Sequence, residues 1–159
     1  MISNGKELLN LIDTLLSKEG YIKKKDTWYK HTDECICFFS IGKSPYSGYY
    51  DHAFGFFLKD LNTTGHEYPA YYKCDLKIGL EFLADKELVR RVLDIENREF
   101  KNTEREFIIS ELFELYVVPF LTDVSSKESI KLAMSKYENL IHHLNMDARK
   151  RLKLKMPKS

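Results

Sequence analysis

The chain has 159 residues, of which 43% are hydrophobic and 13% aromatic, enough to bury the core of one domain without metals or disulfides. Its formal net charge of +1 excludes a strong overall field that would attract nucleic acid or a membrane surface. No run approaches the roughly 20 apolar residues that a transmembrane helix needs, and the first residues lack the apolar segment of a signal peptide. Three cysteines are an odd number, so we expect reduced thiols and a cytoplasmic location.

Charge is unevenly distributed along the chain. Residues 147–159 carry six Lys/Arg and one Asp, which leaves 19 basic against 23 acidic residues in the rest of the sequence. We therefore expect a single, mildly acidic α+β domain over residues 1–146 and a basic C-terminal tail over residues 147–159.

The N-terminal residues predict a core-facing helix over residues 5–19. Asn4 can cap this helix, Glu7 follows three residues later as in a capping box, and leucine and isoleucine recur at helical spacing. Gly20 predicts the end of the helix, because glycine adopts the left-handed conformation at little cost.

Four segments show the two-residue alternation of β-strands: 27–32, 35–41, 49–59 and 71–80. The loops between them are short, which favours antiparallel pairing. The third segment carries the small residues Ala53 and Gly55 on one side, where another part of the chain could approach closely.

After Leu80 the hydrophobic period changes to 3.6, which predicts three helices. Asp85 can cap the first, Thr103 to Glu106 and Ser125 to Glu128 form capping boxes for the others, and Pro119 should end or kink the second helix. The order of elements predicts an α+β fold: a mainly antiparallel four-stranded sheet with an N-terminal helix and three C-terminal helices. We expect the helices to cover one face of the sheet and leave the other partly exposed and aromatic.

Several short motifs together resemble the domain of unknown function 4304 family. They are Gly20-Tyr21 with Lys23 to Lys25 and Thr27 to Tyr29, Lys43-Ser44 with Tyr49-Tyr50, Cys74 to Leu80, and Val118 to Leu121 followed by Ser125 to Ser129. One position departs from the family pattern, since Gly42 stands where the family favours Gln before Lys-Ser. The resemblance implies an α+β bacterial domain and implies no established activity.

Tyrosines gather around the two loops that bound the third predicted strand. A tyrosine buries a large area at low entropic cost and keeps a hydroxyl in water, which suits a recognition surface, although some of these rings could instead line the core. The leading hypothesis is a non-catalytic bacterial cytosolic protein-binding module, with an immunity protein that binds a toxin as one example. Its candidate binding residues are Tyr46, Tyr49, Tyr50, Tyr71, Tyr72, Trp28, Lys43 and Ser44.

The basic tail supports a different hypothesis, an accessory protein that contacts nucleic acid. Lysine and arginine neutralise phosphates, and Arg149, Lys150, Arg151, Lys153 and Lys155 are the candidate contacts. The alternative is that the tail is a solvated chain end, as terminal charge runs often are.

A third hypothesis is an uncharacterised hydrolase with a site near His31, Lys43, Asp51 and His52, which a pocket gathering three of these four residues would favour. The sequence contains no catalytic motif, so no catalytic residue is assigned. The three cysteines include no Cys-x-x-Cys pair and no histidine at ligand spacing, so we expect no metal, and we expect no cofactor.

Overall fold

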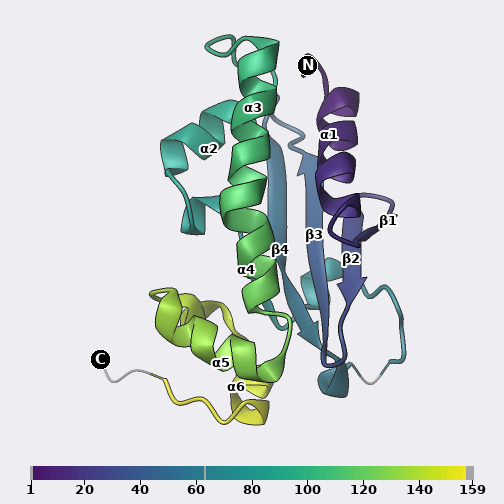
Figure 1. Ribbon diagram of the computed structural model, residues 1–159, viewed down its shortest axis with the longest axis vertical. Coiled ribbons are helices and arrows are strands. Elements are labelled where there is room, and N and C mark those ends of the chain that lie inside the picture. Colours follow the sequence, from purple (N-terminus) through teal and green to yellow (C-terminus); the bar gives the residue numbers. More distant parts are fainter. Residues whose placement is uncertain (1, 63, 157–159) are drawn as a thin grey trace.

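The computed structural model describes residues 2–62 and 64–156 of an α+β fold (Figure 1). Met1, Thr63 and residues 157–159, the end of the predicted tail, lie outside the described residues. One antiparallel sheet has the strand order β1-β2-β3-β4-β5. Its strands are β1 (Ile22–Lys24), β2 (Thr27–His31), β3 (Cys35–Lys43), β4 (Tyr50–Leu58) and β5 (Leu76–Ile78). The α+β class is confirmed, with five strands in place of the expected four.

The helices lie on one face of this sheet and at its ends. In Figure 1, α1 and the long helix formed by α3 and α4 run side by side across that face. Their apolar side chains form the main core with the sheet residues that point toward them, such as Trp28, Phe39 and Phe54. The helices are α1 (Gly5–Ser17), α2 (Lys86–Val92), α3 (Asn102–Leu112), α4 (Val118–Asp123), α5 (Lys127–Lys136) and α6 (Met146–Arg151).

Local signals produce α1 as expected. The Asn4 side chain accepts a hydrogen bond from the Glu7 backbone N–H at 3.0 Å, and the helix buries Leu8, Ile12, Leu15 and Leu16. Gly20 follows the helix with φ of 88°, a left-handed conformation that favours glycine.

The strand predictions were wrong at both edges of the sheet. The lysine-rich stretch that follows Gly20 forms β1, which pairs with β2 through a tight turn at Lys25. At the other edge only 76–78 of the predicted strand 71–80 is extended, because Tyr71–Lys73 form a 3-10 turn. Asp75 ends the pairing there: its carboxylate accepts the Leu58 backbone N–H at 2.6 Å.

The second predicted helix differs from expectation at its start and at its proline. It begins at Asn102 without a side-chain cap, so the capping box predicted from Thr103 is wrong. Pro119 neither ends nor breaks it. A π-helical turn over Phe113–Val117, in which the Val118 N–H bonds to the Phe113 carbonyl, precedes α4 and places the proline in that helix's first turn, where no N–H is needed.

The last predicted helix is divided in two. Its capping box lies one residue later than predicted, with Ser126 accepting from the Ser129 N–H and the Ser129 side chain bonding to the Ser126 backbone. The helix stops at Lys136, and a 3-10 turn over Leu140–His143 follows Asn139, whose φ of 66° is left-handed. The apolar period alone does not reveal this break.

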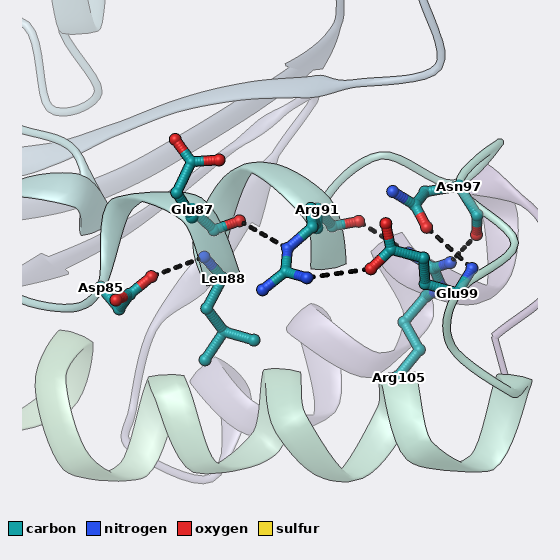
Figure 2. Close-up of polar contacts among 7 residues, drawn as sticks. All are labelled: Asp85, Glu87, Leu88, Arg91, Asn97, Glu99 and Arg105. Carbon is teal, nitrogen blue, oxygen red and sulfur yellow. Dashed lines mark hydrogen bonds and ion pairs between the residues drawn. The ribbon is translucent and has the colours of Figure 1, made fainter.

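Arg105 on α3 is a buried charged residue, and only 2% of its surface is exposed. Thr27 and Ser40, the other buried polar residues of the described chain, are uncharged. Its guanidinium donates to the carbonyl oxygens of Val92 at 2.6 Å, Asp94 at 2.8 Å and Asn97 at 2.5 Å, with a longer contact to Arg91. Figure 2 shows the Arg105 side chain rising from the helix toward the backbone carbonyls of Arg91 and Asn97. The charge is therefore compensated by carbonyl dipoles at the end of α2.

The segment that Arg105 holds is also the anchor of the β3–β4 loop. Leu93 accepts the Tyr50 N–H at 3.0 Å, and the Ile95 N–H donates to Gly48 at 3.0 Å. Arg105 thus connects the helix layer to the end of the sheet at which β4 begins.

Replacing Arg105 by methionine should lower the free energy of unfolding by about 3 kcal/mol, because several buried carbonyls lose their donor. Urea unfolding followed by circular dichroism measures this change. Arg98→Met is the matched control, since Arg98 is exposed, and it should stay within about 0.5 kcal/mol of the unsubstituted protein. Equal unfolding energies for the two variants would contradict the role given to Arg105.

Gly55 confirms the expected close approach on the third predicted strand. A Cβ at this position of β4 would stand 1.9 Å from the backbone oxygen of Leu76 on β5. Gly55→Ala should therefore destabilise the protein by about 2 kcal/mol, because the backbone of β5 must move. Gly42→Ala is the control, since no atom lies within 4 Å of the added methyl group. If both variants unfold at the same urea concentration, the tight contact is absent in solution.

Candidate binding groove

The face of the sheet opposite the helices has its own small apolar cluster. It consists of Tyr29, Ile36, Phe38 and Phe57, covered by residues of the β4–β5 connection such as Tyr68 and Tyr71. The Tyr29 hydroxyl fixes this cover by donating to the Pro69 carbonyl at 2.7 Å. The connection covers only part of the face, and the remainder is open.

The open part is a groove of about 1080 Å³, which we call the trough. Its floor follows from the strand register, because Lys24 of β1, Thr27 of β2, Ser40 of β3 and Ala53 of β4 are successive cross-strand partners. Partners in adjacent strands point to the same face. Three short side chains in a row leave the sheet surface low, whereas the neighbouring row through Tyr29 and Phe38 is filled and covered.

The trough is positively charged. Four lysines line it, Lys24, Lys25, Lys43 and Lys77, against two aspartates, Asp26 and Asp51. None of these lysines forms an ion pair within residues 2–62 and 64–156. Because the sequence before the tail is net acidic, this basic surface is a local feature and favours an anionic ligand.

Two tyrosine rings beside the trough already hold lysine side chains. The Lys24 ammonium lies 4.8 Å from the ring centroid of Tyr68, and the Lys77 ammonium lies 5.8 Å from that of Tyr71. These are cation–π distances. One face of each ring is therefore occupied by a cation, and the ammonium groups are held at the trough.

His52 lines the trough, but its imidazole is engaged elsewhere. Its side chain is 1% exposed, and its ring stacks on Phe39 on the helix-covered side of the sheet. Nε2 accepts the Leu80 backbone N–H at 2.8 Å, which leaves the proton on Nδ1, 3.4 Å from the Tyr50 carbonyl. Burial lowers the pKa of His52 because it disfavours the imidazolium. The neutral ring thus has no free lone pair for a reaction in the trough.

The structure brings only part of the predicted binding residues together. Lys43 and Tyr71 line the trough, and Tyr72, 68% exposed, touches Tyr71 edge-on. Tyr46 is 94% exposed at the tip of the β3–β4 loop, where Ser44 accepts its backbone N–H.

The other predicted binding residues stabilise the fold. The Tyr49 hydroxyl donates to Glu81 at 2.7 Å, and Tyr50 packs against the main core. Trp28 is fully buried on the helix-covered face, where its indole N–H donates to Asp13 at 2.9 Å.

The residues proposed for nucleic acid lie outside the trough. Arg149, Lys150 and Arg151 are on α6, and Arg151 lies 3.7 Å from Asp60 in an ion pair. Lys153 and Lys155 are exposed beyond the helix. Ala148 and Leu152 are buried in the main core, so the beginning of the predicted tail packs on the domain.

Three of the four residues of the hydrolase hypothesis, Lys43, Asp51 and His52, line the trough. His31 is held apart by a bond of 2.7 Å to the Glu67 carbonyl. Asp51 and His52 are neighbours on one strand and point to opposite faces. The residues are thus gathered in one place, but the imidazole is directed away from the aspartate.

No group of described residues could hold a metal ion through three or more His, Cys, Asp or Glu side chains. Burial raises the pKa of the Cys35 and Cys37 thiols to about 12, so both stay protonated. None of the helices in the described part of the chain could cross a membrane.

Sequence reasoning missed Lys24, Lys25 and Lys77 as trough residues. The only local signal for these residues is that each lies on the solvent-exposed side of a strand or turn. Their convergence depends on cross-strand register, which the sequence does not state.

A family model described as "Domain of unknown function (DUF4304)" matches residues 12–123, most of the chain. No curated protein and no solved structure matches.

The buried neutral His52 predicts that stability falls as pH drops below about 6.5, the usual pKa of histidine. The unfolded chain takes up the proton there, while the folded chain resists protonation to a lower pH, so the free energy of unfolding decreases. Urea unfolding between pH 7 and pH 5 measures the slope. His52→Gln keeps an acceptor for the Leu80 N–H and should flatten it. The exposed His66 serves as control, and an unchanged slope in His52→Gln with a changed slope in His66→Gln would refute the assignment.

Proposed function

The chain belongs to the DUF4304 family, whose description states no function, and we propose that it is a non-catalytic module that binds a partner protein on the free face of its sheet. The observation that carries this proposal is the trough, an open groove with four lysines that have no carboxylate partner in the described chain. Unpaired cations around a concave surface favour an anionic ligand.

The state of His52 supports binding over hydrolysis. A general base needs a lone pair directed at the substrate, and the lone pair of this ring accepts the Leu80 N–H. The thiols of Cys35 and Cys37 are buried. Hydrolysis is the second candidate, because Lys43, Asp51 and His52 do line one groove.

The aromatic residues support a protein partner over nucleic acid. Binding of single strands usually requires aromatic faces on which bases stack. At the trough, an ammonium group occupies one face of each ring, Lys24 at Tyr68 and Lys77 at Tyr71, and competes with a stacking base there. The basic residues of α6 and beyond lie outside the trough and do not extend its charge.

The expected setting is the bacterial cytosol, where the three free thiols would stay reduced. If the partner is a toxin, the protein would have an immunity-like role.

The test is affinity capture of the tagged protein from a lysate of the source cells, with and without nuclease, using a charge-reversed trough. The double variant Lys24→Glu with Lys77→Glu should capture about tenfold less of a nuclease-resistant protein partner, because attraction to the partner's acidic groups becomes repulsion. The control Lys6→Glu with Lys131→Glu changes two exposed lysines on α1 and α5 by the same charge and should retain the partner.

Three outcomes contradict the proposal. Equal capture by the two double variants would place the interface away from the trough. Loss of all partners with nuclease would favour nucleic acid. Substrate turnover that His52→Gln abolishes, in a folded protein, would establish the hydrolase.

A further inference from the structure

We infer that the trough holds an extended acidic segment of the partner, lying across the strands with carboxylates near its two ends. This inference rests on the proposed function, because it names the chemistry of the ligand at the same site. It is carried by the positions of the lysines relative to the strand register.

The lysines stand at opposite edges of the sheet. Lys24 and Lys25 belong to β1 and its turn, and Lys77 belongs to β5, where it pairs with Gly55 in the row next to the floor row. Strands lie about 4.8 Å apart, so the four intervals from β1 to β5 span about 19 Å. An extended chain covers about 3.3 Å per residue, so about six residues connect the two cationic ends. Lys43, at the end of β3, lies along the side of this path.

The middle of the trough disfavours an acid. Its floor is Thr27, Ser40 and Ala53, and the hydroxyls of the first two lie 2.9 Å apart in a shared hydrogen bond. Asp51 faces the trough beside the open space above Gly42. Asp51 stands on β4 and Asp26 in the β1–β2 turn, so both lining carboxylates lie toward the ends, where the four lysines outnumber them. The uncharged floor between them offers no cation to an acidic residue, while small or hydroxyl-bearing residues fit it.

Two synthetic peptides of identical composition test this arrangement. One is Glu-Glu-Thr-Ala-Thr-Ala-Glu-Glu, with acids at both ends, and the other is Thr-Ala-Glu-Glu-Glu-Glu-Thr-Ala, with acids in the middle; both are capped to remove terminal charges. Each is titrated into labelled protein to millimolar concentration, and backbone amide shifts are followed by NMR. A thymidine oligonucleotide of equal length is the third ligand.

The end-acid peptide should bind about three- to tenfold more tightly than the middle-acid peptide and should shift the amides of Ser40 and Ala53. Lys24→Ala and Lys77→Ala should each weaken its binding about threefold or more, and Lys6→Ala on α1 should not. Raising the ionic strength from about 0.05 M to about 0.5 M should weaken binding further. These lysines are exposed, so the variants are expected to fold.

Equal affinity for the two peptides, or equal effects of Lys24→Ala and Lys6→Ala, would overturn the inference. Tighter binding of the oligonucleotide would also overturn it, and would favour phosphate over carboxylate. If no peptide binds while the captured partner still depends on the trough, the inference fails and the proposed function stands. If capture is independent of the trough, the proposed function itself fails.

Discussion

The fold depends on the hydrogen bonds that the buried guanidinium of Arg105 donates to backbone carbonyl oxygens. Among residues 2–62 and 64–156, no carboxylate forms an ion pair with Arg105, which instead donates to carbonyl oxygens of Val92, at the end of α2, and of the segment that follows. A guanidinium is charged at any ordinary pH, so these carbonyls must stay in place for α3 to pack on the sheet. The same segment bonds to Gly48 and Tyr50, so the position of the β3–β4 loop and the start of β4 follow from this contact. Lys43, the cross-strand partner of Tyr50, lines the trough at this end of the sheet.

The trough shows why this site was only partly predictable. The tyrosines near the loops beside β4 predicted a binding surface there, and Tyr71 and Lys43 do line the trough. However, the floor is made by small residues in three strands, and three of the four lysines come from the edge strands β1 and β5 and from the β1–β2 turn. A binding residue of this kind is defined by its cross-strand neighbours, which no local pattern specifies.

The fold itself was predictable where a local pattern extends over a whole element. The apolar period of α1 coincides with a real helix, because burial selects the residues that the period marks. The apolar run of β3 coincides with a central strand, in which residues 35–41 are buried on both faces. The pattern failed where tertiary contacts decide. β1 consists of exposed residues and exists because β2 pairs with it. Buried apolar residues continue through the π-helical turn before Pro119, so the apolar pattern does not mark it.

Trp28 gives the molecule a built-in optical probe. It is the single tryptophan of the chain, and it is buried between α1 and the sheet, with its ring edge-on to Phe39 at 6.2 Å. Its fluorescence therefore reports on the helix-covered face, while the trough lies behind it on the other side of β2. Emission at short wavelength follows from an indole shielded from water, and a red shift marks the loss of that shield. A ligand in the trough should not change the wavelength of this emission, whereas unfolding should shift it to the red. The same fluorescence measurement therefore distinguishes binding from unfolding.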